Sequence, residues 1–129
     1  MNEQANEVRE AIEHAIAENE VILFMKGTPN APACGFSART VAALQSLGAR
    51  FAAVDVLVDP RIRQELSALS QWPTIPQLFV RGEFVGGCDI VTEMLATGEL
   101  AQLLGTEPPA AAPEEPAIAS GTLQIENRL

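Results

Sequence analysis

At 129 residues, 47% of them apolar, the chain has the size of one domain with a real hydrophobic core, which excludes wholesale disorder. The formal net charge of −9 argues against binding to nucleic-acid phosphates as the main task. Two cysteines, Cys34 and Cys88, are too few for a disulfide-stapled scaffold and indicate reactive or ligand thiols in a reducing compartment.

The first seven residues include Glu3 and Glu7, where a secretory signal or transit peptide would carry basic residues. We therefore expect a cytoplasmic protein, or the mature form of an organellar one. Apolar residues recur at helical spacing over residues 8–16, which predicts an amphipathic helix that Asn6 can cap. The only histidine, His14, lies among acids on the polar face and is interpreted as a solvated surface residue.

The continuous apolar run at residues 21–25 predicts a strand buried on both faces and is far too short to cross a membrane. A loop with two prolines follows over residues 27–33. A second helix is predicted over residues 35–47, ending at Gly48, and a second strand over residues 51–56.

Asp59 and Pro60 open a third predicted helix, with an apolar stripe formed by Ile62, Leu66 and Leu69. Residues 71–76 contain two prolines and cannot be helix interior. A hairpin with a glycine-containing turn is expected over residues 78–85.

Two further helices are predicted after Gly86 and Gly87 interrupt the last strand. Asp89 can cap the first of them, and a short apolar helix over residues 100–104 completes the domain before Gly105. A β-α-β unit followed by a helix and a hairpin predicts an α/β fold with a central four-stranded mixed sheet and helices on both faces.

The composition changes abruptly after residue 105, where prolines are interleaved with alanines and glutamates. We therefore expect one domain over residues 1–105 and a flexible Pro/Ala/Glu-rich tail over residues 106–129. Within the tail, residues 122–126 alternate briefly as a strand would, and two interpretations stay open, a partner-docking segment or a frayed end.

Cys34 follows a proline-containing loop and stands at the predicted start of a helix. Free N–H groups and the positive end of the helix dipole would stabilise its thiolate, whereas a buried structural cysteine is the alternative interpretation. Lys26, the only lysine of the chain, could add a second favourable charge or could simply be solvated at a strand end. Gly35 would allow a ligand to approach the sulfur closely.

Ser37 occupies the position where a C-x-x-C motif would carry its second cysteine. The chain therefore cannot close a disulfide at that spacing, and the sulfur of Cys34 must react with an outside thiol or bind something. Cys88 is the only other candidate within the chain for resolving a disulfide.

Four motifs together resemble the monothiol glutaredoxins of the C-G-F-S type. They are Lys26-Gly27-Thr28, Cys34-Gly35-Phe36-Ser37, Trp72-Pro73-Thr74-Ile75-Pro76-Gln77 and Gly86-Gly87-Cys88-Asp89, and the match spans about residues 5–105. The resemblance implies a thioredoxin-like fold, which agrees with the element order read from the residues.

The resemblance also implies a glutathione site made by Lys26, Arg63, Ile75, Cys88 and Asp89. Lys26 and Arg63 would hold carboxylates of glutathione, and the Ile75 backbone would pair with its main chain beside a cis peptide bond before Pro76. Cys88 and Asp89 would receive the γ-glutamyl end. Phe36 is left with two interpretations, a shield for the site or simple packing.

Two functions are compatible with this reading. In the first, Cys34 is the metal ligand of a bridging [2Fe–2S] cluster, which needs four thiolate-type ligands. Two chains and two glutathiones would supply them in a homodimer, and the resemblance implies a BolA-type protein as an alternative partner and iron–sulfur proteins as clients. In the second, Cys34 is the catalytic nucleophile of a glutathione-dependent thiol oxidoreductase. A third hypothesis is a non-catalytic adaptor whose tail tethers another protein.

Overall fold

The computed structural model describes residues 3–106, which contain one four-stranded and one two-stranded sheet. In chain order the elements are α1 (Glu3–Glu18), β1 (Val21–Met25), β2 (Gly27–Thr28), β3 (Ala31–Pro32), α2 (Gly35–Ser46), β4 (Ala52–Asp55), the 3₁₀ helix η1 (Val56–Val58), α3 (Pro60–Ser70), β5 (Gln77–Val80), β6 (Glu83–Gly86), α4 (Cys88–Thr97) and α5 (Glu99–Leu104).

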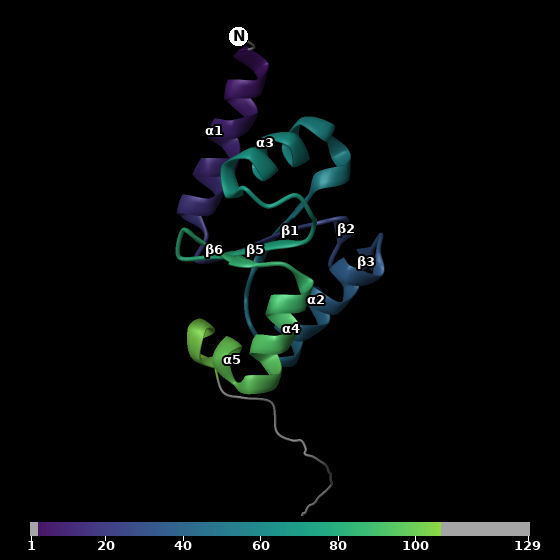
Figure 1. The fold of residues 1–129 in the computed structure, drawn as a ribbon, viewed down its shortest axis with the longest axis vertical. Coiled ribbons are helices and arrows are strands. Elements are labelled where there is room, and N and C mark those ends of the chain that lie inside the picture. The colour runs from purple at the N-terminus through teal and green to yellow at the C-terminus, as the bar shows by residue number, and fades with distance from the viewer. Residues whose placement is uncertain (1–2, 107–129) are drawn as a thin grey trace, which may run out of the picture.

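The larger sheet has the strand order β4-β1-β5-β6 and is covered by helices on both faces (Figure 1). Strand β1 runs parallel to β4 and antiparallel to β5, and β5 and β6 form an antiparallel hairpin. Helices α1 and α3 lie on one face, and α2, α4 and α5 on the other (Figure 1). The predicted mixed sheet between two helical layers is therefore confirmed.

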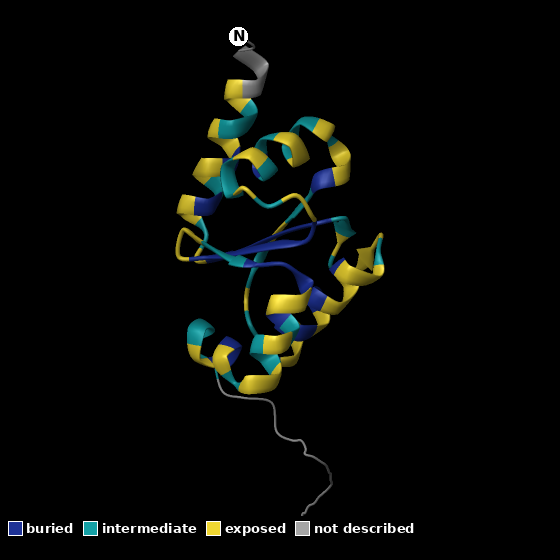
Figure 2. Cartoon of the chain, in the orientation of Figure 1, coloured by how far each residue is buried: buried dark blue, intermediate teal, exposed yellow. Residues whose placement is uncertain are grey.

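Strand β1 is buried on both faces because its residues alternate between two apolar cores (Figure 2). Ile22 and Phe24 belong to the core beneath α1 and α3, whereas Leu23 and Met25 belong to the core against α2, α4 and α5. Alternate residues of a strand point to opposite faces, so a strand between two helical layers must be apolar throughout. Because β1 lies in the centre of the sheet, the position of its last residue is fixed, and the functional site begins at this end of the strand.

The local signals in the loops give a mixed result. Asp59 caps α3 by accepting the Arg61 N–H at 3.0 Å, as predicted. The β5–β6 turn is confirmed as well, and Arg81 and Gly82 both have positive φ (50° and 85°), the combination that two-residue turns of type I′ require. The short hairpin β2–β3 is not anticipated by the sequence pattern, which indicated only loop there. The strand predicted over residues 51–56 is confined to Ala52–Asp55, because Val56 begins η1, a helix that the pattern did not predict.

Two predicted helix caps are wrong. Helix α1 already begins at Glu3, since Glu3, Gln4 and Ala5 all favour helix, and Asn6 is an exposed residue inside it. Helix α4 begins at Cys88, with Gly87 in extended conformation as its N-cap, so Asp89 lies in the first turn rather than at the cap. Its carboxylate still interacts favourably with the positive end of the helix dipole there.

His14 is a surface residue as predicted, and its Nε2 lies 3.0 Å from Glu18 Oε2 on the same helix. No helix within residues 3–106 is long and apolar enough to cross a membrane. The tail expected after residue 105 lies outside the described residues from position 107 onward, so it stays a prediction, as does the possible strand at residues 122–126.

Candidate functional site

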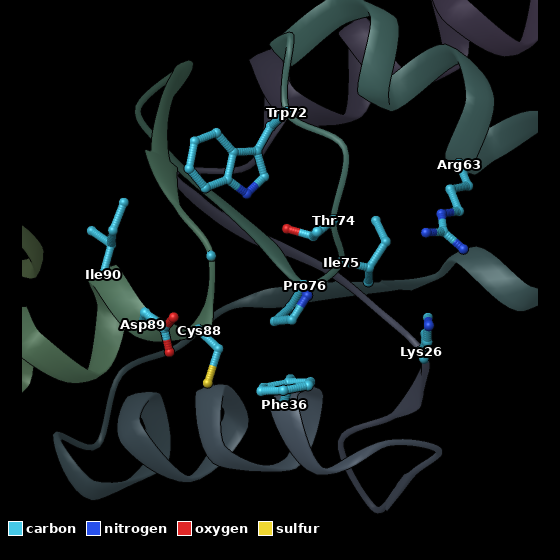
Figure 3. A pocket seen from close by; sticks show the side chains of 11 residues that line it. Lys26, Phe36, Arg63, Trp72, Thr74, Ile75, Pro76, Cys88, Asp89 and Ile90 are labelled. Carbon is cyan, nitrogen blue, oxygen red and sulfur yellow. The ribbon is translucent and has the colours of Figure 1, made fainter.

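A pocket opens at the sheet edge where the parallel strands β1 and β4 both end, the edge at which α/β folds commonly hold ligands. Its cavity volume is about 330 Å³. The lining comes from the end of β1, the first turns of α2, α3 and α4, and the loop before β5. The lining residues are Lys26, Phe36, Arg63, Trp72, Thr74, Ile75, Pro76, Gly87, Cys88, Asp89 and Ile90 (Figure 3).

Cys34 is the N-cap residue of α2, with extended backbone angles (φ −152°, ψ 158°). Its Sγ occupies the place of a capping oxygen, because the Ser37 N–H donates to it at 3.4 Å. The predicted position at a helix start is therefore confirmed, and the partly exposed sulfur is not the buried structural cysteine of the alternative interpretation. A thiolate satisfies this position better than a thiol, since it is a stronger acceptor and carries the charge that the helix dipole favours.

The pKa of the Cys34 thiol is lowered from its ordinary value of 9.0. Partial burial of the sulfur, the largest single effect, raises the pKa, but the opposing contributions together outweigh it. In order of size these are the Ser37 hydroxyl, the backbone N–H groups of Ser37 and Phe36, and the positive charge of Lys26. Of the two interpretations of Lys26, the functional one is therefore supported by its electrostatic effect on Cys34.

Ser37 has a role that the sequence reading missed, since it treated this residue only as a missing cysteine. Its side chain is fully buried, and Oγ lies 3.4 Å from Cys34 Sγ while accepting the Lys26 backbone N–H at 3.1 Å. When Cys34 is a thiolate, the hydroxyl can therefore donate to the sulfur and still accept from Lys26. Serine at this position builds the thiolate environment directly.

One end of the pocket is cationic. Lys26 and Arg63 lie together on one side in Figure 3, although 36 residues separate them in the sequence. Outside the pocket, Arg9 pairs with Glu65 and Arg81 with Glu20. Within the part of the chain that the structure describes, neither Lys26 nor Arg63 has such a partner, so both are available to an anionic ligand.

The opposite end of the pocket is formed by the first turn of α4, which carries Cys88 and Asp89 (Figure 3). No side chain caps this helix, so its first N–H groups are left for a ligand, next to the exposed Asp89 carboxylate. Glycine at position 87 allows this turn to lie close to the loop before β5, since a Cβ there would lie 3.1 Å from the Pro76 carbonyl oxygen. Cys88 is buried but lines the pocket.

The floor between the two ends is the loop before β5, where the Ile75–Pro76 peptide bond is cis, as the resemblance implied. The Ile75 side chain is buried in the core beneath α1 and α3, so the backbone is what Ile75 can offer a ligand. The buried Gln77 amide holds this loop from below by donating to the carbonyl oxygens of Trp72 at 2.9 Å and Thr74 at 3.1 Å. The sequence reading assigned Gln77 no role.

Five of the six predicted site residues thus line one pocket: Lys26, Arg63, Ile75, Cys88 and Asp89. Cys34 is not a lining residue itself, but Phe36, two positions further on, is. Phe36 is 54% exposed, and the Arg39 guanidinium lies 5.3 Å from its ring centroid. Of its two interpretations, packing in the core is therefore excluded, and Phe36 forms a wall of the site.

Comparison with known proteins places this geometry in context. The glutaredoxin family model matches residues 21–85. Monothiol glutaredoxin-5, a mitochondrial protein of Saccharomyces cerevisiae, is 53% identical over 114 residues, covering 86% of this chain and 75% of the relative. Glutaredoxin 4 of Escherichia coli K12 is 58% identical over 95 residues, covering 74% and 83%.

Solved structures give the same result for the fold. A truncated monomeric 1-C-Grx1 from Trypanosoma brucei aligns with a TM-score of 0.70 and 43% identity, covering 78% of this chain and 94% of the other. A glutaredoxin–glutathione complex from buckwheat aligns with a TM-score of 0.73 and 25% identity, covering 81% and 94%. The fold expected from the four motifs, a thioredoxin-like one, is therefore confirmed.

Proposed function

The chain belongs to the monothiol glutaredoxins, and on this premise we propose that it binds glutathione in the pocket and shares a [2Fe–2S] cluster through Cys34 with a second chain. The observation that carries the proposal is the arrangement of one stabilised thiolate beside a pocket with opposite charges at its two ends. The cluster is cargo that the protein receives and passes to iron–sulfur client proteins.

Glutathione suits the pocket because its charges are complementary to those of the lining residues. The tripeptide has two carboxylates and one ammonium group, and the pocket offers Lys26 and Arg63 at one end and Asp89 at the other. The free N–H groups at the start of α4 can receive the γ-glutamyl carboxylate while Asp89 pairs with the ammonium. The buckwheat relative, itself a glutathione complex, supports the same ligand class.

The number of ligands explains why a second chain is needed. A [2Fe–2S] cluster requires four thiolate-type ligands, and residues 6–106 contain no group of three or more His, Cys, Asp or Glu side chains able to hold a metal. Cys34 is the one thiol presented at a helix start in a partly exposed position. Two copies of Cys34 and the thiols of two glutathiones complete the set, which makes the loaded form a glutathione-dependent homodimer.

The proposal extends to the partners and the compartment expected from the sequence. A BolA-type protein can replace one of the two chains in a heterodimer, and client apoproteins receive the cluster. Because glutathione ligands can dissociate without unfolding the chain, transfer needs no large rearrangement of the fold. A cytoplasmic location, or an organelle of similar redox poise, is consistent with two reduced cysteines.

A second candidate function is supported by the lowered pKa of Cys34. The Cys34 thiolate attacks the glutathione sulfur of a glutathionylated protein, forming a Cys34–glutathione disulfide and releasing the protein thiolate, which takes up a proton. A second glutathione thiolate then attacks this mixed disulfide, glutathione disulfide leaves, and Cys34 is regenerated as a thiolate. Resolution by the buried Cys88 is the alternative second step.

Anaerobic reconstitution with iron, sulfide and glutathione tests the carrier function. We expect a visible absorbance that appears together with a shift to dimer mass, and the loss of both in the Cys34→Ala variant. Lys26→Gln should shorten the cluster lifetime, whereas Arg81→Gln, which removes a cation paired with Glu20 away from the pocket, serves as its matched control. Absence of a cluster in the wild type, together with brisk glutathione-dependent disulfide reduction, would establish the oxidoreductase function instead.

A further inference from the structure

The carboxylate of Asp55, at the last position of β4, reaches across to the loop that carries Lys26. Asp55 pairs in register with Met25, the last residue of β1. Two residues later the chain turns out of the sheet at Gly27, where φ is +87°, and the Gly27 N–H leaves the strand ladder. Asp55 Oδ1 accepts this N–H at 3.0 Å and so satisfies a donor that would otherwise need another partner.

The same oxygen accepts a second N–H, that of Leu57, at 2.9 Å. Leu57 belongs to η1, which leads directly through Asp59 into α3, the helix that carries Arg63. One carboxylate oxygen therefore joins Gly27, the residue after Lys26, to Leu57 in η1, the segment that precedes the helix of Arg63. We propose that Asp55 is a positioning residue for ligand binding, which holds the backbone of Lys26 in place relative to Arg63.

The remaining anchors of the Lys26 peptide come from other elements. Its N–H donates to Ser37 Oγ in α2 at 3.1 Å, and its carbonyl accepts the Ala33 N–H at 2.9 Å. The Ser37 bond holds the peptide before Lys26 to the thiol side of the site. The peptide after Lys26 is held at both ends, by Ala33 on its carbonyl oxygen and by Asp55 on the Gly27 N–H. A long lysine side chain binds an anion well only when its backbone is fixed, because ordering it otherwise costs conformational entropy.

A purely local role for Asp55 would need only the contact to Leu57. An aspartate that caps the turn two residues later is common in loops, and that bond alone would complete it. The bond to Gly27 spans 28 residues and adds nothing to the turn. Gly27 also lies close to β3, since a Cβ at this position would lie 2.5 Å from the Ala31 carbonyl oxygen.

This proposal rests on the proposed function, in which glutathione is the ligand. Reduced glutathione is therefore titrated into the full chain, and its binding is followed by NMR of the backbone amides. Asp55→Ser keeps a side-chain oxygen for the local turn but is too short to reach Gly27. We expect it to weaken glutathione binding about fivefold, the effect of losing one ordinary hydrogen bond. Asp55→Asn, whose amide oxygen can accept both N–H groups, should restore binding to within about twofold of the wild type.

A double-mutant cycle distinguishes positioning from a general loss of stability. If Asp55 acts through Lys26, the Asp55→Ser effect should disappear in a Lys26→Gln background, because the two changes then remove the same interaction. Asp59→Ser is the control, since serine retains the N-cap of α3 and, among the described residues, no hydrogen bond or ion pair joins Asp59 to the Lys26 loop; the change also removes the ion pair between Asp59 and Arg61. Asp55→Thr, with a hydroxyl of the same reach and a β-branched side chain suited to a strand, replaces Asp55→Ser if that variant does not fold.

The outcomes are separable. No glutathione binding by the wild type would overturn the proposed ligand itself. Normal wild-type binding with an unchanged affinity in Asp55→Ser, or an equal loss in the presence and absence of Lys26, would overturn the positioning role alone. A loss as large in the Asp59→Ser control would also overturn it, because the effect would then follow any change at this end of α3.

Discussion

Replacement of Ser37 by alanine tests how the thiolate of Cys34 is stabilised. The change removes one fully buried hydroxyl and with it two interactions, the contact with Cys34 Sγ at 3.4 Å and the acceptor for the Lys26 N–H at 3.1 Å. The orphaned Lys26 N–H should lower the free energy of unfolding by about 1–3 kcal/mol. The pKa of Cys34 should rise, since the Ser37 hydroxyl is the largest of the effects that lower it.

The pH dependence of the free energy of unfolding provides a second test of the Ser37→Ala prediction. In the folded protein the pKa of Cys34 lies below the value of 9.0 that describes the unfolded chain. A group whose folded pKa is depressed stabilises the fold above the unfolded pKa and loses that contribution as pH falls through the folded pKa. The stability difference between wild type and Ser37→Ala should therefore widen as pH rises to 9.0 and above, and narrow where the thiol is protonated in both states.

The assay is alkylation of Cys34 by iodoacetamide as a function of pH, quantified on the Cys34 peptide, with urea unfolding at low and high pH beside it. Ser46→Ala is the control, because it makes the same change in the same helix where the hydroxyl only donates to the Ala43 carbonyl at 2.7 Å. The control should leave the alkylation midpoint unchanged. A Ser37→Ala midpoint equal to that of the wild type would refute the reasoning, even if stability fell.

Three further predictions concern the fold around the site. Gly27→Ala should cost at least about 2 kcal/mol in urea unfolding, because its Cβ would meet the Ala31 oxygen at 2.5 Å, whereas Gly48→Ala, with positive φ but open space, should cost only about 1 kcal/mol. Leu66→Ala, a fully buried residue of α3, should lower the free energy of unfolding by about 2–5 kcal/mol without altering Cys34 alkylation. Gln77→Met removes the donor to two carbonyls of the loop over residues 72–76, so glutathione affinity and the protection of that loop from hydrogen exchange should both fall.

The fold was largely predictable because its main elements have local signals. The apolar run of β1, the Asp59 cap of α3 and the glycine turn between β5 and β6 are all readable within a few residues. The errors have local causes as well, because a helix start depends on which of several acceptable residues ends the extended backbone, as Gly87 does before α4. The β2–β3 hairpin could not be predicted, since it depends on a bond between Ala33 and Lys26 that closes only in the folded chain.

The pocket-lining residues proposed to bind the ligand were predictable, whereas the geometry of the site and the residues that support it were not. Family resemblance supplied the ligand-binding roles of Lys26, Arg63 and Asp89, and no spacing in the sequence would bring these three to one pocket. Ser37 and Asp55 were missed because their partners are backbone N–H groups, which sequence patterns do not display. The carboxyl ends of parallel strands are a general location for functional polar residues, and that rule was the one signal that could have indicated Asp55.

The peptide of Lys26 connects the two halves of the chemistry. On one side, Ser37 Oγ touches both Cys34 Sγ and the Lys26 N–H, so the hydroxyl that stabilises the thiolate also fixes this backbone. On the other side, Asp55 fixes the next peptide, and the side chain between them extends into the pocket (Figure 3). Lys26 therefore acts on Cys34 through its charge and is held by the same hydroxyl that Cys34 uses. Position 37 holds serine rather than a second cysteine. A cysteine there could not act as this hydrogen-bond partner while oxidised to a disulfide, whereas the serine hydroxyl remains a partner in every redox state of Cys34.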